Sequence, residues 1–347
     1  MNIKNHIIQK NQSARDALAI LNKVEGTKSL TLFVLDQNKL VGTITDGDIR
    51  RGLLNNFEIS HSIDHFMNKD FKFLTKINNQ LETLKKLRKD GFKLIPIINS
   101  KNNLIEIIDL SKTVTKLPIS AVLMAGGKGT RLRPLTDNIP KPMLSIGGKP
   151  LIEHNINRLK KFGINEFFIS VNYLKNYIMD YFEDGSSRDI SIKYLIEDKP
   201  LGTIGSLSLI DKIKNRDLLL MNADILTDLN YEVFYQNFLK SNSKMMVATI
   251  PYNVNIPYAI IKSKNDFVND FEEKPTYTYH SNGGIYLLKK DVKNKIPKNR
   301  FYNATDLMKL LINKKQLGKF SHKGFWLDIG NPKDFYQSQE DIKFLKL

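Results

Sequence analysis

Glycines that directly follow an apolar run are the clearest chemical feature of the sequence. Residues 119–124 read as a buried strand, and the residues after it are Ala125, Gly126, Gly127, Gly129 and Thr130. Glycines at a strand end let backbone N–H groups approach a phosphate chain closely. Arg131 and, beyond a turn, Lys141 bring positive charge to neutralise it. The segment therefore predicts a polyphosphate-binding loop.

Two common phosphate motifs do not describe this loop. The kinase-type loop closes with Gly-Lys and then Ser or Thr, and no such triplet closes the segment. A dinucleotide fingerprint does not fit either, because Arg131 and Arg133 stand where the helix of that fold begins its apolar face. The plainer alternative is a basic βα turn that binds nothing.

Two carboxylates stand near the ends of other apolar segments. Asp224 comes just past a predicted buried strand at residues 217–222, and a buried carboxylate is costly unless it binds a cation or another partner. Asp328 lies in the segment Trp326-Leu-Asp-Ile-Gly-Asn-Pro332. The Asn-Pro pair at its end predicts the start of a terminal helix.

The alternation of predicted strands and helices from residue 119 onward predicts the fold that positions the loop and the two carboxylates. Strands are expected at Glu166–Val171, Ser191–Ile196, Asp217–Asn222 and Lys244–Ile250, and helices at 149–162, 176–183, 203–213 and 230–241, with Thr203 as an N-cap. This pattern predicts an α/β fold whose mostly parallel sheet has helices on both faces and ligands at the carboxyl ends of its strands. Shorter strands at Tyr258–Lys262, Asp266–Phe271 and Gly283–Leu288 predict an antiparallel addition that forms one wall of the cleft.

The first third of the chain contains an internal repeat of about 55 residues. Each repeat has an amphipathic helix followed by two strands, with strands at 29–35 and 40–44 in the first and at 93–98 and 104–108 in the second. Two such units could bury each other's sheet faces. A short polar linker at residues 111–118 then predicts domains at residues 1–116 and 117–347.

Together, the motifs between about Ile119 and Gln337 resemble the signature of the sugar-1-phosphate nucleotidyltransferases. The matching segments are Gly126-Gly-Lys-Gly-Thr-Arg-Leu-Arg-Pro134, Lys141-Pro-Met143, Pro200-Leu-Gly-Thr203, Asn222-Ala-Asp224, Glu273-Lys-Pro275, Asn282-Gly-Gly284 and Trp326-Leu-Asp328. The resemblance implies a Rossmann-like three-layer domain that joins a nucleoside triphosphate to a sugar 1-phosphate. Ile204 and Asn331 depart from the family pattern, which has Ala and Thr there.

The resemblance also implies a role for each matching residue. Nucleotide contacts are implied for Ala125, Gly126, Gly127, Gly129, Thr130, Pro200, Gly202 and Thr203. Catalytic roles are implied for Arg131 and Lys141 on the phosphates, and for Asp224 and Asp328 as ligands of Mg²⁺. Contacts to the sugar phosphate are implied for Glu273, Lys274, Asn282 and Gly283.

The repeat in the first third resembles a tandem cystathionine-β-synthase (CBS) module, a ligand-sensing attachment. Its best local match is Gly42-Thr-Ile-Thr-Asp-Gly-Asp48, and the resemblance implies that Thr45 and Asp48 bind an adenine or guanine nucleotide. The second repeat lacks this Thr-x-x-Asp pair. Alternatively, Thr45 and Asp48 simply cap the following helix, and one pair of residues could do both.

The order of the two domains indicates a narrower group of sugar-1-phosphate nucleotidyltransferases. A CBS pair ahead of this transferase resembles the glucosamine-1-phosphate guanylyltransferases of bacterial legionaminic (nonulosonic) acid biosynthesis, which implies GTP and glucosamine 1-phosphate as substrates. Mannose- or heptose-1-phosphate guanylyltransferases and UTP- or dTTP-using enzymes are alternatives. So is an inactive nucleotide-sensing subunit, although that class is expected to lose the signature Arg, Lys or Asp, and all of them are present.

The composition and charge of the chain exclude or disfavour several classes of function. The chain has 347 residues, a net charge of +17 and no Cys, so disulfides and thiolate metal sites are excluded. The lysines are scattered, without a basic helix or an aromatic-interleaved stripe, which argues against nucleic acid as a partner. No apolar run is long enough for a membrane span and no signal peptide is evident, so we expect a cytoplasmic protein. A homo-oligomer is expected from the resemblance to both families.

Overall fold

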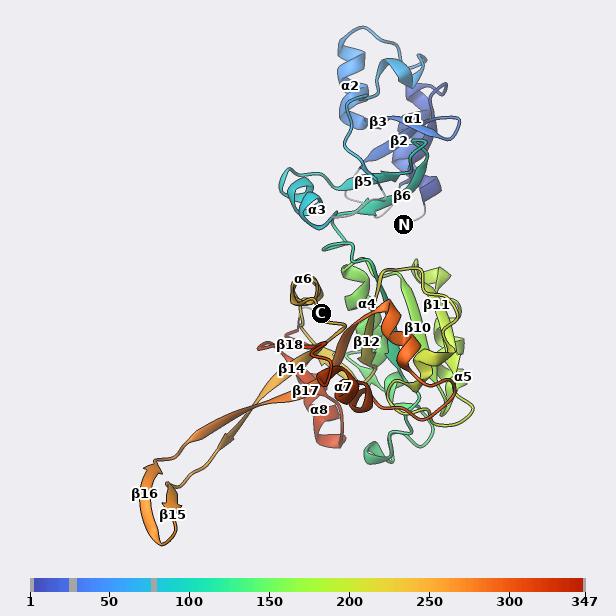
Figure 1. Cartoon of the computed structure of the whole chain (residues 1–347). Helices are drawn as coiled ribbons and strands as arrows, with labels where there is room; N and C mark the ends of the chain where they lie inside the picture. The colour runs from blue at the N-terminus through green and yellow to red at the C-terminus, as the bar shows by residue number, and fades with distance from the viewer. Residues whose placement is uncertain (1–2, 25–29, 76–79, 346–347) are drawn as a thin grey trace. The chain divides into compact units, whose positions relative to one another are not determined.

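The structure is a computed structural model that describes residues 3–24, 30–75 and 80–345 (Figure 1). Contacts within the chain divide it into two units, Met1–Lys116 and Leu117–Leu347. Ser29, the first residue of a predicted strand, lies outside the described residues. None of the helices in the described part of the chain is both long and apolar enough to cross a membrane.

The first unit consists of two small sheets with the same pairing. Its strands are β1 (Ile7–Gln9), β2 (Thr31–Asp36), β3 (Lys39–Thr45), β4 (Leu74–Thr75), β5 (Leu94–Ile98) and β6 (Leu104–Asp109), and its helices are α1 (Ala14–Lys23), α2 (Asp46–Leu54) and α3 (Gln80–Lys89). In each sheet the first strand runs parallel to the second, and the second runs antiparallel to the third. The predicted repeat is therefore present in the fold.

Capping boxes begin both helices of the first repeat. At α2, the Thr45 hydroxyl donates to Asp48 Oδ2 at 2.6 Å, and the Asp48 N–H donates back to Thr45 Oγ1 at 3.2 Å. Ser13 and Asp16 make the same arrangement at α1. These bonds satisfy N–H groups that a helix start leaves without partners. The capping role predicted for Thr45 and Asp48 is confirmed, and their nucleotide role stays a prediction.

A seven-stranded sheet forms the centre of the second unit, in the order β11-β10-β7-β12-β17-β14-β18. Its strands are β7 (Ile119–Met124), β10 (Glu166–Val171), β11 (Ser191–Ile196), β12 (Asp217–Asn222), β14 (Met245–Asn255), β17 (Thr276–Lys289) and β18 (Leu317–Ser321). Strands β11, β10, β7 and β12 are parallel, and β17 is antiparallel to both of its neighbours. The predicted mostly parallel sheet is thus confirmed.

Helices cover both faces of this sheet. They are α4 (Leu151–Lys161), α5 (Lys175–Phe182), α6 (Tyr231–Ser241), α7 (Ala304–Ile312) and α8 (Pro332–Asp341). Leu218 and Leu220 of β12 belong to the same core cluster as Leu307 of α7. The alternate residues Asp217 and Met221 receive hydrogen bonds from tyrosines of α6. Successive strand residues point to opposite faces, so α6 and α7 lie on opposite sides of the sheet.

The helix predicted over residues 203–213 is wrong. Only a short 3₁₀ helix, Gly205–Leu209, forms there. A Cβ at Gly205 would lie 2.6 Å from the carbonyl oxygen of Arg300, so the segment is packed against another backbone. Thr203 is not an N-cap of its own helix, because its hydroxyl accepts from the N–H of Ala304 at the start of α7. Tertiary hydrogen bonds replace the helical ones.

Of the antiparallel strands predicted after Pro257, Gly283–Leu288 lies in β17 and pairs with β12, whereas the other two do not form a wall of the cleft as predicted. Strands β14 and β17 continue past the sheet, paired from Thr249–Asn282 to Asn255–Thr276. The hairpin of β15 (Ile260–Lys264) and β16 (Phe267–Glu272) follows at their far end. The antiparallel pairing is as expected, but residues 250–281 form a ribbon that projects from the domain (Figure 1), which we call the arm.

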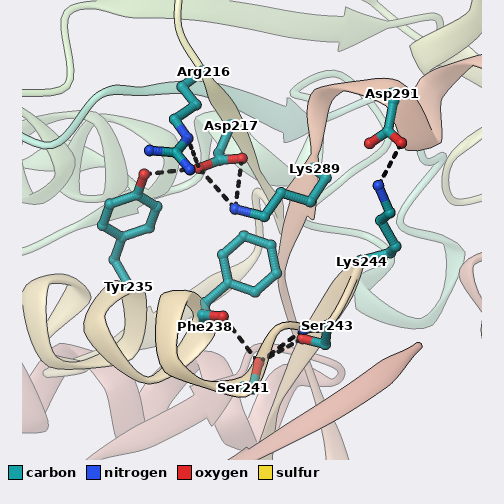
Figure 2. A network of polar contacts seen from close by, with 9 residues as sticks. All are labelled: Arg216, Asp217, Tyr235, Phe238, Ser241, Ser243, Lys244, Lys289 and Asp291. Carbon is teal, nitrogen blue, oxygen red and sulfur yellow. Dashed lines mark hydrogen bonds and ion pairs between the residues drawn. The ribbon is translucent and has the colours of Figure 1, made fainter. Parts of the chain in front are cut away.

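A buried carboxylate joins three elements at the amino end of β12 (Figure 2). Asp217 is fully buried, accepts from the Tyr235 hydroxyl at 2.7 Å and pairs with Lys289 Nζ at 3.2 Å. Burial, and then the bond to Asp217, raises the pKa of Tyr235 far above its ordinary value, so its hydroxyl stays protonated. Lys289 also lies 4.4 Å from the centre of the Phe238 ring. The network fixes α6 and β17 against β12.

We expect Tyr235→Phe to lower the free energy of unfolding by about 1–3 kcal/mol, because it removes a hydrogen bond to a buried carboxylate. Urea denaturation followed by circular dichroism measures the change. Tyr252→Phe is the matched control, since Tyr252 is 62% exposed, and it should change stability by less than about 0.5 kcal/mol. Equal effects of the two substitutions would contradict the structural role of this network.

Candidate active site

The glycine-rich loop between β7 and the 3₁₀ helix Thr130–Leu132 is built around Lys141. Gly129 has a φ of 64°, and a Cβ there would lie 3.1 Å from the Lys141 Cβ. Thr136 donates its hydroxyl to the Gly129 carbonyl at 2.8 Å. By contrast, a Cβ at Gly127 would meet nothing within 4 Å, so protein packing does not require glycine there. A ligand that approaches the backbone closely would require it.

The loop faces a cleft of about 240 Å³. Seven of the predicted site residues line it, namely Ala125, Gly127, Gly129, Thr130, Arg131, Lys141 and Asp224. Met124 and Gly330 also line it and were not predicted. Gly330 lies in the same motif as Asp328, and a Cβ there would be 3.7 Å from Arg131 Nη1. The motif around Asp328 is therefore the sequence feature that could have identified Gly330 as a residue of the cleft.

A small ladder brings the two predicted metal carboxylates together. Asp224 directly precedes β13 (Ile225–Thr227), and Asp328 ends β19 (Trp326–Asp328). These strands pair antiparallel with Ile225 opposite Asp328, and Ile329 donates its N–H to the Asp224 carbonyl at 3.1 Å. Buried apolar residues of β13 hold the ladder against the core. Two segments far apart in the sequence thus place their carboxylates side by side.

Lys141 connects this pair to the loop. Its Nζ lies 2.5 Å from Asp224 Oδ2 and 3.7 Å from Asp328 Oδ1, and its side chain is 11% exposed. Burial and the charge of Asp224 raise the pKa of Asp328, against the attraction of Lys141 and Arg131. The ionised form of Asp328 is therefore disfavoured mainly by burial and secondly by the neighbouring carboxylate.

The two carboxylates fit a magnesium ion. Asp224 Oδ1 and Asp328 Oδ1 are buried and accept no hydrogen bond within the described residues. No group of three or more His, Cys, Asp or Glu side chains that could hold a metal occurs in that part of the chain. Mg²⁺ is commonly bound by one or two carboxylates, with phosphate oxygens and water as its other ligands. The donor set suits an ion that arrives with a phosphate substrate.

The predicted nucleobase residues Pro200, Gly202 and Thr203 do not line the cleft. Gly202 has a φ of 76°, and a Cβ there would lie 2.8 Å from the Tyr302 carbonyl, so packing alone accounts for this glycine. Pro200 is exposed. Glu197 holds their loop by accepting from the Leu201 N–H at 2.9 Å. Their nucleotide role stays a prediction.

Glu197 is a residue that the sequence analysis missed. A Cβ at Gly126 would lie 3.5 Å from Glu197 Oε1, which also accepts from the Ser170 hydroxyl. The Asn172 amide donates to the Glu197 carbonyl at 2.6 Å. Glu197 therefore connects the glycine-rich loop with the segment around Pro200. Its position directly after a predicted strand was the signal that could have found it.

The predicted sugar-phosphate residues fall into two groups. Asn282 and Gly283 lie at the base of the arm, where Trp326 donates its indole N–H to the Gly283 carbonyl at 2.9 Å and fixes them beside β19. Glu273 and Lys274 lie beyond the last β14–β17 pair, at the far part of the arm, and are exposed. The structure thus places Gly283 against Trp326 of β19, the strand that ends at Asp328, and does not bring Glu273 and Lys274 to the cleft.

Comparison with protein families gives two matches. A model of the nucleotidyl transferase family matches residues 120–343, well over half of the chain. A model of the CBS domain matches residues 1–55.

Among curated relatives, the mannose-1-phosphate guanyltransferase of Debaryomyces hansenii is 30% identical over 233 residues, which are 62% of this chain and 62% of that protein. The corresponding protein of Saccharomyces cerevisiae is 28% identical over 233 residues, 62% of this chain and 63% of that one. The chain thus spans about 62% of the length of the curated relatives it matches.

Solved structures share the fold of the second unit. HddC from Yersinia pseudotuberculosis, also solved in complex with GMP-PN, is 28% identical with a TM-score of 0.50, over 64% of this chain and 99% of that one. A solved protein from Bacillus anthracis has a TM-score of 0.55 at 22% identity, over 66% of this chain and 97% of that one. At that identity the likeness concerns the fold alone.

Because folding raises the pKa of Asp328, its ionised form costs stability at neutral pH, and that cost disappears when the group is protonated. We expect Asp328→Asn to raise the free energy of unfolding at pH 7 by up to about 1 kcal/mol, since solvent screens this 38% exposed side chain. The gain should shrink as the pH falls through the raised pKa. Denaturation at pH 7 and pH 4 measures both effects.

Asp137→Asn is the control for this substitution. Asp137 is 47% exposed and pairs with Arg133 on the surface, so its loss should change stability by less than about 0.5 kcal/mol. A destabilising effect of Asp328→Asn at pH 7 would show that the carboxylate is well satisfied in the fold.

Proposed function

The chain belongs to the nucleotidyl transferase family, and we propose that it transfers GMP from GTP to a sugar 1-phosphate, forming a nucleotide sugar and pyrophosphate. The observation that carries the proposal is the cleft itself. There an open glycine loop, two cations and a close pair of carboxylates meet at the carboxyl ends of β7 and β12. This set of groups suits a polyphosphate and a metal ion.

The proposed reaction needs no activated side-chain nucleophile. A phosphate oxygen of the sugar phosphate is already anionic; it attacks the α-phosphorus of GTP while the bond to pyrophosphate breaks. The enzyme must hold two polyanions in line and stabilise the charge on the leaving pyrophosphate. Gly127, Gly129 and Thr130 would bind the phosphates through the loop, and Arg131 would stabilise the pyrophosphate.

Lys141 and the carboxylate pair would act at the centre of the cleft. Lys141 would bind the α-phosphate region, since it lies between the loop and both carboxylates. Asp224 and Asp328 would hold Mg²⁺, which offsets the repulsion between the phosphates when it is bound. Asn282 and Gly283 would contact the sugar from the base of the arm.

The choice of base and sugar follows the relatives. The two curated relatives described above are named mannose-1-phosphate guanyltransferases, and HddC has been solved with GMP-PN. We therefore propose GTP and mannose 1-phosphate as the first pair to test. Glucosamine 1-phosphate is the second candidate, because a CBS domain precedes the transferase, as in the architecture that the sequence resembles.

We further propose that the first unit binds an adenine or guanine nucleotide and regulates activity. The CBS match covers Thr45 and Asp48. In the structure both carboxylate oxygens of Asp48 are engaged, one by Thr45 and the other by Arg51 at 2.5 Å. Bound ribose hydroxyls would therefore compete with Arg51 for Asp48, whose position is already fixed by the helix cap.

We expect pyrophosphate release from GTP and mannose 1-phosphate with Mg²⁺, measured in a panel of four nucleoside triphosphates against mannose 1-phosphate and glucosamine 1-phosphate. Asp224→Ala should reduce turnover more than about 100-fold while the fold survives, because it removes a proposed metal ligand. Asp228→Ala is the control, since Asp228 pairs with His322 instead, at 3.1 Å, and this variant should remain active.

Activity only with another base would overturn the guanylyl assignment but keep the transfer chemistry. Full activity of Asp224→Ala would show that the metal site is misplaced. Release of no pyrophosphate from any pair, with or without added AMP, would favour the inactive regulatory subunit.

For the first unit, we expect Asp48→Asn to weaken AMP binding to the full chain about tenfold, because hydrogen bonds to a charged acceptor are lost. Isothermal titration calorimetry measures this affinity. Asp16→Asn is the matched control, since Asp16 closes the same kind of capping box at α1. Equal affinities of the two variants would leave Asp48 with its capping role alone.

A further inference from the structure

A second cavity, of about 440 Å³, lies at the amino end of β12, and Figure 2 shows part of its lining. It is formed by the segment that leads into β12, by the end of β17 and by the 3₁₀ helix Lys290–Lys295. Asp217, the first residue of β12, lines this cavity, whereas Asp224, beyond the last residue of the strand, lines the cleft. The six residues of β12 alone span about 17 Å, so the two sites are distinct.

Cations outnumber carboxylates in the lining of this cavity. The cations are Arg216, Lys289, Lys290 and Lys293, and three aspartates accompany them. Lys244, which lies outside the lining, adds a fifth positive charge through its ion pair with one of these aspartates. Five cations against three carboxylates leave a net charge of +2. Because like charges repel, gathering them around an open cavity is unfavourable unless an anion joins them.

Two of the three aspartates are already engaged by cations. Asp217 pairs with Lys289 Nζ at 3.2 Å, and Asp291 pairs with Lys244 Nζ at 2.7 Å. The hydrogen bond from Lys244 lowers the pKa of Asp291, so this carboxylate stays ionised and paired. The third, Asp211, is exposed and makes no ion pair within the described residues. Its charge therefore opposes a bound anion, which offers a test of the site.

The charges of Lys290 and Lys293 are not balanced by a carboxylate. The Lys290 ammonium donates to the Ile213 carbonyl at 2.6 Å, and the Lys293 ammonium donates to the Ile210 carbonyl. Each ammonium has three N–H donors, and one carbonyl uses only one of them. The alternative is that these lysines merely hold residues 210–213 in place. That role needs one donor from each lysine and makes no use of the positive charge.

Apolar packing beneath the cavity fixes the segment that carries these lysines. Val292 and Ile296 are buried in the same core cluster as Ile210 and Ile213, whose carbonyls the lysines bind. The 3₁₀ helix and residues 210–213 are therefore held together by side chains as well as by the ammonium groups. Donors that are placed before a ligand arrives lose less conformational entropy when it binds.

We propose that this cavity binds a small phosphorylated compound through the ammonium groups of Lys290 and Lys293, with Arg216 at its rim. Phosphate oxygens accept several charge-assisted hydrogen bonds, which matches the excess charge and the unused donors. No aromatic side chain of the described residues lines the cavity, so none is placed to stack on a nucleobase. The ligand class is therefore a compact phosphate, such as pyrophosphate or a sugar phosphate. The site stands independently of the proposed transfer reaction.

Lysine acetylation of the full chain, followed by mass spectrometry, tests the site because it measures each lysine separately. Pyrophosphate or, in a second series, mannose 1-phosphate should slow acetylation of Lys290 and Lys293 at least about threefold at saturation. Lys212 is the matched control, since it is exposed, follows Asp211 and lies outside the lining, and its rate should not change. Lys141 reports binding in the cleft separately, so failure of the proposed function would leave this readout intact.

Two substitutions should shift this protection in opposite directions. Asp211→Asn should lower the ligand concentration that gives half-protection about threefold, because it removes a charge that opposes the anion. Lys293→Met keeps a long apolar stem but removes the ammonium, and should raise the concentration that half-protects Lys290 about tenfold. Circular dichroism checks that both variants are folded.

Three results would overturn the inference. Unchanged acetylation of Lys290 and Lys293 at high concentrations of both compounds would show that the cavity binds neither. Equal protection of Lys212 would show general screening of charge instead of a site. Unchanged or weaker protection in Asp211→Asn would show that the lysines serve only to hold residues 210–213. Protection of the two lysines by either compound, strengthened in Asp211→Asn, supports the site, and the compound effective at the lower concentration is the better ligand.

Discussion

The contact of Lys141 with Asp224 and Asp328 is the interaction on which the candidate site depends. It joins three segments that are distant in sequence: the turn after the glycine-rich loop, the end of β12 and the terminal β19. The cation makes two neighbouring carboxylates tolerable in a partly buried place, although burial still raises the pKa of Asp328. A divalent ion bound by these two carboxylates would favour their ionised forms.

The central sheet separates stability from chemistry along a single strand. At the amino end of β12, Asp217 is fully buried and bound by Tyr235 and Lys289, and these contacts hold α6 and β17 in place. Just past the carboxyl end, Asp224 lines the cleft and pairs with Lys141. The carboxylate at one end of the strand therefore binds elements of the frame, and the carboxylate beyond the other end faces the cleft.

Local patterns predicted much of this architecture. Strands β7, β10, β11 and β12 have the predicted bounds, because β7, β10 and β12 are largely apolar runs and β11 is a short strand with polar and apolar residues. The prediction of a helix over residues 203–213 was wrong. Gly202 and Gly205 pack closely against residues 300–302, and the Thr203 hydroxyl accepts a hydrogen bond from the start of α7. The predicted position of the arm was also wrong. A shift to shorter strands after Pro257 predicted an antiparallel addition, but no local signal tells whether such strands fold onto a cleft or extend from it.

The sequence by itself determined the chemistry that the cleft can hold. Glycines after an apolar strand, Arg131, Lys141 and two aspartates are choices of side chain, and the sequence predicted them before any contact was known. Only the tertiary structure decided which of these groups meet. The β13–β19 ladder unites Asp224 with Asp328, while the continuous β14–β17 ladder holds Lys274 away from the same cleft. The reason is that strand pairing over long sequence distances depends on the burial of whole sheet faces, which no single motif encodes.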